Sequence, residues 1–496
     1  MRCLLRFMRP VIRQLQFLSP LFWMVSSWPG YMNSDAYLVF VEAKKNNFSN
    51  WHPVAFGFLM KLSILFTSSP APLLIAQLFL VILSLKFLLR SMKFGPDIRA
   101  LITFIFFFLP TVGVFVATLG KDVFFMCALF AVTGAVLNIK ANFHFNRNLF
   151  IVSFGIFCLC VFRWNGPLVG LTALMIFAFE VRRTTLKLSA PILAYGAGCL
   201  FLLLAPFSDN QGGKDIMDVG KHLDIAWLLK KDPLVFSSDE IKVLNYVAPI
   251  QKWSGSQANC DNSVMPLIWA VFTVDPTAAA HLTEKREAVA SIWSKHLKAD
   301  TWEIIKGRMC RSRAILAFHS VYPPLKAETS NDVLKKWYFV DVPALSPSIQ
   351  SFGTNISEWW RFLPHISLFG QPALPAFLLG VRLVLSRMNR KILIPTLLSA
   401  TGVVSIAVGG TGVEPRYLYP AVFLMWITIL SPKDSINKKN PMDSSLVSRT
   451  PFVSPPVMRL THCFRPAIWW RTRPESDRQA HCVAGNGCSC CGVLQA

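Results

Sequence analysis

Charged residues are scarce in this chain. Asp, Glu, Lys and Arg together make up 16% of its 496 residues, against roughly a quarter in soluble globular proteins. Apolar residues reach 53% of the sequence, and the mean hydropathy is +0.44. This shortage of charge excludes an ordinary soluble protein and indicates a membrane protein.

Acidic residues are the scarcer charge: 27 Asp and Glu stand against 50 Lys and Arg, for a net charge of +23. No uniform basic stripe with interleaved aromatic residues lies outside the apolar runs, so we expect no nucleic-acid partner. Most of the Lys and Arg lie in short links between apolar runs, as in cytoplasmic loops of membrane proteins. The positions of the basic residues therefore predict which links face the cytoplasm.

Cysteines are scarce in the large polar stretch of the chain, where a disulfide-rich domain would need them. Of the 12 cysteines, only Cys260 and Cys310 lie in the large polar stretch late in the chain, and the others lie in apolar, amino-terminal or carboxyl-terminal segments. The sequence therefore does not predict a disulfide-rich domain. An oxidising compartment would permit one bridge between these two cysteines.

The apolar runs predict membrane-spanning helices, each of which needs about 20 mostly apolar residues. The first run is broken by Pro20 and has no small-residue cleavage site before Tyr31, which favours an uncleaved helix over a signal peptide. The candidate spans are 11–28, 71–90, 98–119, 121–139, 149–164, 166–181, 188–206, 366–385, 391–410 and 415–431.

The short apolar segment 53–68 decides the topology. It contains Lys61 and could cross the membrane, lie in the interface or re-enter. Only if it does not cross do the basic links fall in the cytoplasm together with both termini, as positive residues prefer. We therefore predict an all-α polytopic membrane protein with about ten transmembrane helices. The basic links are 90–99, 140–147, 182–187 and 387–391.

This topology divides the chain into four parts. Residues 1–206 form a membrane module that includes a first outer loop at 29–52, and residues 366–431 form the carboxyl-terminal membrane helices. Residues 207–365 form a large non-cytoplasmic loop, which is too long for a bare connection and should contain helices. Residues 432–496 are rich in Ser, Pro, Arg and Lys and predict a disordered cytoplasmic tail.

Two patterns stand out in the large loop. A run of charged residues predicts the solvated face of an amphipathic helix, in which Asp218 and His222 share a side. Two ligands without a third favour a surface pair over a metal site. The loop tryptophans either stack on sugar rings or form an aromatic belt at the interface, and we favour the belt. The charged residues are Lys214, Asp215, Asp218, Lys221, His222 and Asp224, and the tryptophans are Trp227, Trp253, Trp269, Trp293, Trp302, Trp337, Trp359 and Trp360.

Ionisable residues recur at the predicted outer links. Asp35 follows the first helix and is well placed to act as a general base. Taken singly, such residues also fit ordinary loop carboxylates or helix caps, but ionisable groups at the membrane edge are costly and commonly functional. The outer links contribute Asp35, Trp51, His52, Lys121, Asp122, Arg163, Asn165, Arg416 and Tyr417.

Taken together, these side chains suit one kind of chemistry. Guanidinium groups bind phosphate through paired hydrogen bonds, and carboxylates accept a hydroxyl proton or bind a divalent cation. Apolar walls suit a lipid tail. The combination predicts transfer from a lipid-linked phosphate donor.

The order of these motifs resembles that of the GT-C glycosyltransferases, which include the protein O-mannosyltransferases, the aminoarabinose transferase of lipid A and the oligosaccharyltransferase catalytic subunit. The likeness covers roughly residues 30–430. It consists of an Asp after the first helix, the segment Trp51-His52-Pro53, a later outer acidic residue, a large late outer loop and the segment Glu414-Pro415-Arg416-Tyr417 followed by Tyr419 and Pro420.

The resemblance implies an inverting enzyme that uses a polyisoprenyl-phosphate sugar and a lipid or glycan acceptor. Asp35 maps to the catalytic carboxylate and Asp122 to the second acidic residue, while Arg163, Arg416 and Lys121 would stabilise the leaving phosphate. His52 would shape the loop and, with Trp51, Asn165 and Tyr417, contribute to substrate binding. The expected location is a bacterial inner membrane in preference to the endoplasmic reticulum.

The chain departs from the family at two points. One proline follows His52 where the family has two, and there is no Asp-x-Asp pair, so dependence on Mg²⁺ or Mn²⁺ stays open. Two other functions remain: an O-antigen polymerase or ligase, and a transporter or lipid flippase. Transporters often contain repeated halves and midplane charges. This sequence contains no visible repeat and its charges gather at one predicted surface, which favours the transferase.

Overall fold

The computed structural model describes most of the chain up to residue 432, and every named element in the described ranges is a helix. The one strand-like feature there is an isolated parallel bridge between Tyr31 and Thr118. The predicted all-α class is confirmed for this part of the chain. The described ranges are 2–48, 52–139, 145–181, 187–204, 211–255, 276–312, 345–361, 373–386, 389–409 and 415–432.

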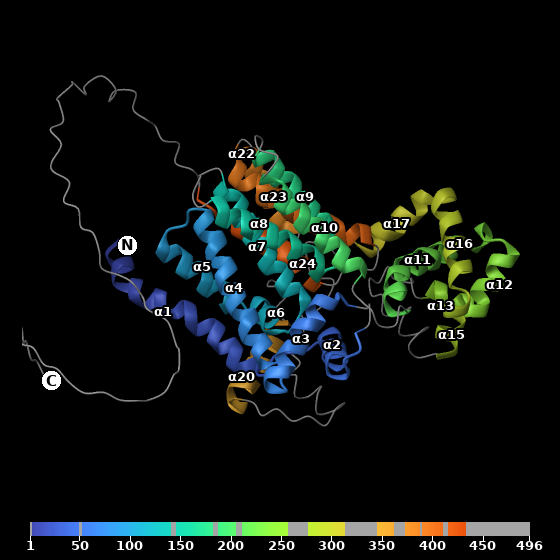
Figure 1. Cartoon of the computed structure of the whole chain (residues 1–496), viewed down its shortest axis with the longest axis horizontal. Coiled ribbons are helices and arrows are strands. Elements are labelled where there is room, and N and C mark those ends of the chain that lie inside the picture. The colour runs from blue at the N-terminus through green and yellow to red at the C-terminus, as the bar shows by residue number, and fades with distance from the viewer. Residues whose placement is uncertain are drawn as a thin grey trace, which may run out of the picture. The chain divides into compact units, whose positions relative to one another are not determined.

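Each predicted span coincides with a helix or a pair of helices (Figure 1). The apolar helices of the first half are α1 (Arg2–Ser27), α3 (Val54–Thr67), α4 (Ala71–Ser91), α5 (Pro96–Phe108), α6 (Pro110–Ala117), α7 (Lys121–Ile139), α8 (Phe145–Phe162), α9 (Gly166–Val181) and α10 (Ser189–Leu204). The later ones are α22 (Ala373–Leu385), α23 (Arg390–Gly409) and α24 (Pro415–Leu430). The predicted tail lies outside the described residues from 433 onward.

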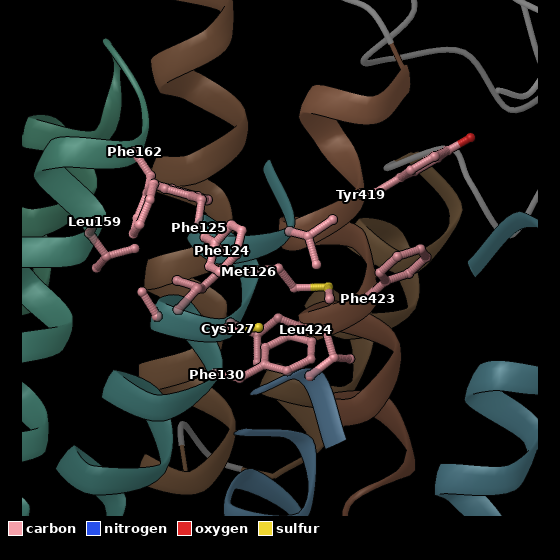
Figure 2. Close-up of a cluster of buried hydrophobic side chains, with 14 of the residues drawn as sticks. Phe124, Phe125, Met126, Cys127, Phe130, Leu159, Phe162, Tyr419, Phe423 and Leu424 are labelled. Carbon is pink, nitrogen blue, oxygen red and sulfur yellow. The ribbon is translucent and has the colours of Figure 1, made fainter. Parts of the chain in front are cut away.

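Helix α7 is the centre of the apolar bundle that these helices form. It contacts α4, α8, α9, α23 and α24, and 89% of its apolar stretch is buried, against about half for α4. The ring of its Phe124 stacks on that of Phe162 at 5.2 Å (Figure 2). The ring of Phe130 meets that of Phe106 edge-on at 6.4 Å. A helix that is apolar on all sides belongs in the interior.

The outer helices of the bundle expose large apolar side chains. Phe66 of α3 is 75% exposed and Leu203 of α10 is 76% exposed. Such surfaces are rare on soluble monomers and are typical of contact with lipid. By length and composition, α4, α7, α8 and most of α23 could each cross a membrane. Several long apolar helices thus indicate a membrane protein, and the count of ten spans stays a prediction.

The predicted span 98–119 is not one straight helix. Helices α5 and α6 are bent by 78° at Leu109, because Pro110 lacks an N–H and disfavours a helical residue before it. Leu109 accordingly has extended angles, with φ −66° and ψ 117°. Trp23 donates from Nε1 to the carbonyl of Phe107 at 2.7 Å, and its ring packs where Gly113 has no side chain.

The loop between α10 and α22 contains helices with a core of their own, as predicted. They are α11 (Gln211–Lys231), the 3-10 turn η2 (Pro233–Val235), α12 (Ser238–Val247), α13 (Ile250–Gly255), α15 (Pro276–Glu284), α16 (Arg286–Ala299) and α17 (Thr301–Arg311), which we call the loop helices. Cys310 is disulfide-bonded, while Cys260, with which the sequence would permit a bridge, lies outside the described residues. A further helix, α20 (Pro347–Arg361), follows them.

The charged face predicted for 214–224 was wrong for three residues. Asp218, His222 and Asp224 are 8%, 5% and 0% exposed. Arginines of α16 and α17 bind the two carboxylates, and the ring of Trp253 lies 6.1 Å from that of His222. Among the loop tryptophans, Trp227 and Trp253 are also buried, in the core of the loop helices. These two tryptophans therefore do not belong to an aromatic belt.

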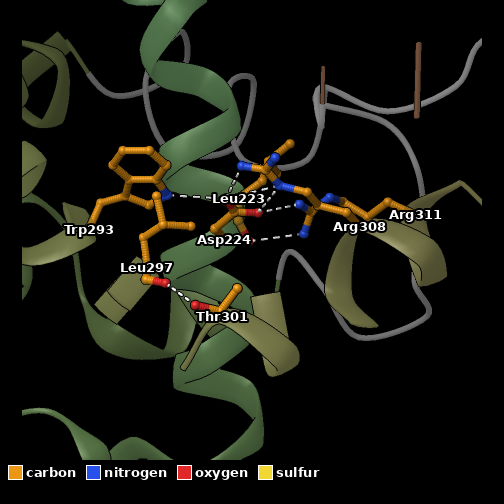
Figure 3. Close-up of polar contacts among 7 residues, drawn as sticks. All are labelled: Leu223, Asp224, Trp293, Leu297, Thr301, Arg308 and Arg311. Atoms are coloured by element: carbon orange, nitrogen blue, oxygen red, sulfur yellow. Dashed lines mark hydrogen bonds and ion pairs between the residues drawn. The ribbon is translucent and has the colours of Figure 1, made fainter. Parts of the chain in front are cut away.

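Asp224 is the centre of the buried polar contacts (Figure 3). Arg308 donates from Nη2 at 2.7 Å, and Arg311 donates from Nη2 to the other oxygen at 2.6 Å. Trp293 adds a hydrogen bond from Nε1 at 3.1 Å. Both oxygens of this carboxylate are thus held by short, charge-assisted hydrogen bonds.

Candidate functional site

Asp35 is placed by a short segment that joins α1 to helix α2 (Ser34–Lys45). Asn33 caps α2 by accepting from the backbone N–H of Ala36 at 2.8 Å, so the carboxylate of Asp35 lies in the first turn. Just before it, Tyr31 pairs with the end of α6: its N–H donates to Ala117, and its carbonyl accepts from Leu119. The first outer loop is therefore tied to the entry of α7.

Lys121 and Asp122 lie in the first turn of α7. The extended backbone before them is held by Gln77 of α4, a polar residue that is only 1% exposed. Its Nε2 donates to the carbonyls of Val116 at 2.8 Å and Thr118 at 2.9 Å. Backbone groups that the helix break leaves without helical partners are satisfied in this way.

These two segments meet at a small pocket. Asp35, His52, Lys121 and Asp122 supply its ionisable side chains, and these come from three separate stretches of sequence. The remaining lining residues are Asn33, Ala36, Val39, Phe56 and Gly120. The structure thus brings four of the sequence-predicted residues to one place.

Lys121 links the acid and the imidazole. Its Nζ lies 3.5 Å from Oδ2 of Asp35 and 2.7 Å from Nδ1 of His52. An ammonium group only donates hydrogen bonds, so Nδ1 accepts and the ring proton of a neutral His52 is on Nε2. This Nε2 faces Oδ1 of Asp35 at 3.9 Å, which is longer than a hydrogen bond. The side chain of Asp35 keeps 18% exposure.

Arg163 is engaged behind the pocket. Its Nε lies 3.3 Å from Oδ1 of Asp122, and its Nη1 donates to the backbone carbonyl of Tyr417 at 2.9 Å. The guanidinium also lies over the rings of Phe125 and Tyr417, 5.1 Å from each centre. Arg163 is 6% exposed and does not line the pocket. In this arrangement it orients Asp122.

The other predicted site residues lie apart from the pocket lining. Asn165 donates to Ser405 Oγ at 2.7 Å and so joins the α8–α9 link to α23. Tyr417 meets the site through Arg163. Trp51 and the side chain of Arg416 lie outside the described residues.

Sequence reasoning missed Asn33 and Gln77, which build the site without being ionisable. Each left a signal in the sequence: Asn33 stands where a helix cap precedes Asp35, and Gln77 interrupts a strongly apolar run. Within the described ranges, no group of three or more His, Cys, Asp or Glu side chains gathers as a metal site would require. The divalent cation stays a prediction.

Arg390, from the basic link 387–391, lies at the opposite end of α7. Arg390 donates from Nη2 to the carbonyl of Val136, in the last turn of α7, and from Nε to Glu180 at 2.7 Å. The pocket is formed at the first turn of the same helix, roughly 20 Å away along its axis. The ionisable pocket and Arg390 therefore occupy opposite ends of the bundle.

Segment 53–68 stays at the pocket end. Phe56, near the start of α3, lies 6.2 Å from the ring of Phe124 in the first turn of α7. At its other end, Ser63 accepts from the N–H of Leu73, in the first turn of α4. Both contacts of α3 are therefore with the first turns of α7 and α4. Whether α3 crosses the membrane stays a prediction.

Comparisons of the chain with protein-family models, with curated proteins and with solved structures find no match. The function is therefore inferred from the chemistry of the pocket.

Proposed function

We propose that this chain is a membrane glycosyltransferase, which moves a sugar from a polyisoprenyl-phosphate donor to an acceptor hydroxyl with inversion at the anomeric carbon. The observation that carries the proposal is the pocket in which Asp35, His52, Lys121 and Asp122 meet at one end of an apolar bundle. A carboxylate can remove a hydroxyl proton, and an ammonium group beside it can stabilise a departing phosphate at the same place.

The proposal includes a multi-pass topology of about ten spans, with the pocket on the non-cytoplasmic side. Two features support it. Arg390, from a basic link, lies at the far end of α7 from the pocket, and α3 contacts the first turns of α7 and α4. A lipid-linked donor would then reach the pocket from the surrounding membrane.

In the proposed reaction, Asp35 accepts the proton of the acceptor hydroxyl as its oxygen attacks the anomeric carbon of the donor. The bond between that carbon and the phosphate oxygen breaks on the opposite face, which inverts the centre. The electron pair leaves with the polyisoprenyl phosphate, whose added charge Lys121 stabilises. Lys121 lies 3.5 Å from Asp35, so the departing phosphate and the base would be on the same side of the pocket.

Asp122 and Arg163 have a second role in this scheme. Asp122 lines the pocket and is oriented by Arg163 from behind. A carboxylate held in this way can accept a hydrogen bond from a sugar hydroxyl and fix the ring against the base. Arg163 is accordingly a positioning residue, and its contact with the backbone of Tyr417 connects the pocket to α24.

The test is a transfer assay with the full-length protein in lipid vesicles, using a panel of polyisoprenyl-phosphate sugars and lipid or glycan acceptors. We expect release of polyisoprenyl phosphate together with an inverted glycosidic linkage in the product. Asp35→Asn should abolish both products. Asp97→Asn is the matched control, since Asp97 pairs with Arg13 away from the pocket.

Two results would contradict the proposal. An absence of transfer from every donor would remove the glycosyltransferase assignment. Transfer that Asp35→Asn and Asp97→Asn leave equally intact would remove Asp35 as the base. Separately, a cysteine placed at position 122 that reacts with a membrane-impermeant reagent only from the cytoplasmic side would overturn the topology.

A further inference from the structure

Helix α20 has three distinct faces. One turn of an α-helix takes about 3.6 residues, so positions spaced by three, four and seven share a side. On this basis the positions 350, 353, 354 and 357 form one face, 349, 352, 356 and 359 a second, and 351, 355 and 358 a third. Each face takes about a third of the circumference.

The first face packs against the protein. Gln350 donates to the carbonyl of Trp28 at 3.2 Å, and Ser357 is 3% exposed. Gly353 touches α1 so closely that a Cβ there would lie 2.6 Å from Ser26. This face consists of small and polar residues, the kind that lets helices approach each other within a membrane.

The second face is apolar and points outward. Phe352 is 58% exposed, Trp359 63% and Ile349 38%. The ring of Phe352 lies 6.1 Å from that of Phe22 on α1, whose neighbour Leu21 is itself 48% exposed. The apolar face of α20 therefore continues the exposed apolar surface of α1.

The third face is polar and exposed, with Ser351 and Asn355 both open to solvent. A helix in a water-soluble protein turns its apolar side inward and its polar side outward. Helix α20 instead exposes two faces, the apolar second face and the polar third face. Three faces of three kinds need three environments: protein, lipid and water.

We infer that α20 is an interfacial helix that lies on the membrane surface with Ile349, Phe352 and Trp359 in the lipid. The apolar face of α20 contacts a phospholipid bilayer, because this face is continuous with the exposed apolar surface of α1 and because Trp prefers the membrane interface. The inference does not depend on the proposed enzymatic activity.

Membrane contact at α20 also bears on the pocket. Gln350 holds the carbonyl of Trp28, and Tyr31, three residues later, pairs with Ala117 and Leu119 at the entry of α7. The segment that leads to Asp35 is thus fixed between α20 and α6. A bilayer that positions α20 therefore also sets how deep in the membrane the edge of the pocket lies.

The experiment places one nitroxide at a time on the full chain in phosphatidylcholine vesicles. Ile349→Cys and Phe352→Cys report on the apolar face, and Ser351→Cys and Asn355→Cys are matched controls on the polar face of the same helix. The signal of identically labelled wild type, from the native cysteines, is subtracted. Collision with oxygen, which prefers lipid, and with a water-soluble nickel chelate then gives the depth of each label.

We expect the labels at 349 and 352 to lie about 5–10 Å below the headgroup level, and those at 351 and 355 to be reached by the nickel chelate. Equal access of the chelate to all four positions would overturn the inference. Protection of 349 and 352 from both oxygen and chelate would also overturn it, because a second copy or another protein would then cover this face.

Discussion

Two carboxylates of this chain are held in opposite ways. In the loop helices, Asp224 is 0% exposed and receives hydrogen bonds of 2.6 Å and 2.7 Å from two arginines. In the apolar bundle, Asp35 keeps 18% exposure, with Lys121 and His52 at 3.5 Å and 3.9 Å. Asp35 also lines a pocket, whereas Asp224 is enclosed by Trp293, Arg308 and Arg311 (Figure 3).

The difference separates a structural ion pair from a site with room for chemistry. A carboxylate enclosed by short contacts to arginine fixes neighbouring helices, and its loss leaves buried positive charge. A carboxylate with longer contacts beside a cavity can exchange partners and accept a proton. Asp122 is intermediate: it lines the pocket but is 8% exposed and faces Arg163 at 3.3 Å.

The largest expected effect is on transfer by the bundle. Asp35→Asn should lower the transfer rate by about 10²–10⁴-fold, because the amide cannot accept the hydroxyl proton. Amide hydrogen exchange of α7 should stay near that of wild type, since the longer contacts at Asp35 contribute little to stability. A variant that loses the protection of α7 along with transfer would make Asp35 a structural residue like Asp224.

The next effect is on the stability of the loop helices. Asp224→Asn should cost about 3–5 kcal/mol, because Arg311, which is 1% exposed, keeps its buried charge without a counterion. Hydrogen exchange of α11 and α17 in the full-length protein measures this loss, as exchange faster by about 10²–10⁴-fold.

Asp239→Asn is the control for this stability loss. The carboxylate of Asp239 pairs with Lys242 on the surface at 86% exposure, so its loss should cost at most about 1 kcal/mol. If both variants exchange alike, the buried cluster does not hold the loop helices together.

A smaller effect concerns acid. Burial, with Lys221 and Arg286 nearby and opposed by Asp218, lowers the pKa of His222 from 6.5 to about 4. Between these values the unfolded chain binds more protons than the folded one, so the free energy of unfolding falls as the pH falls from 6.5 to 4. The loss should reach about 2–3 kcal/mol.

Asp218 acts in the same direction. Burial would raise its pKa, but hydrogen bonds from Lys221 and Arg286 outweigh this and lower it, so its stabilisation is also lost in acid. Exchange of α11, corrected for the intrinsic effect of pH, should show the loss in wild type and a flatter profile in His222→Gln. An unchanged slope in this variant would mean that His222 does not carry the effect.

The smallest effect should come from the cation of the pocket. Lys121→Met should lower the transfer rate by about tenfold, through loss of charge near the leaving phosphate, while Lys121→Arg should recover part of it. The loss should appear in kcat, because the interaction strengthens as the phosphate departs. Loss confined to KM would instead assign Lys121 to ground-state binding of the donor.

The sequence predicted the places of the helices well and their shapes less well. Apolar runs marked the helices of the bundle, but the single run 98–119 predicts one span where the structure has two helices that meet at Pro110. Polar periodicity predicted the helix α11. The same periodicity results whether water or arginine side chains cover the charged side of a helix. Asp224 was therefore assigned to the surface, because Arg311 lies 87 residues away in sequence.

Composition and periodicity by themselves determined that this is an all-α chain with apolar helices and basic links between them. Long apolar runs avoid water, and a backbone in lipid must satisfy its own hydrogen bonds. Only the tertiary structure decided which polar residues meet. It placed Asp35, His52, Lys121 and Asp122 at one pocket and turned Arg163 away from it, toward Asp122 and a carbonyl 254 residues along the chain. Contacts at that sequence distance depend on helix packing, which local patterns do not encode.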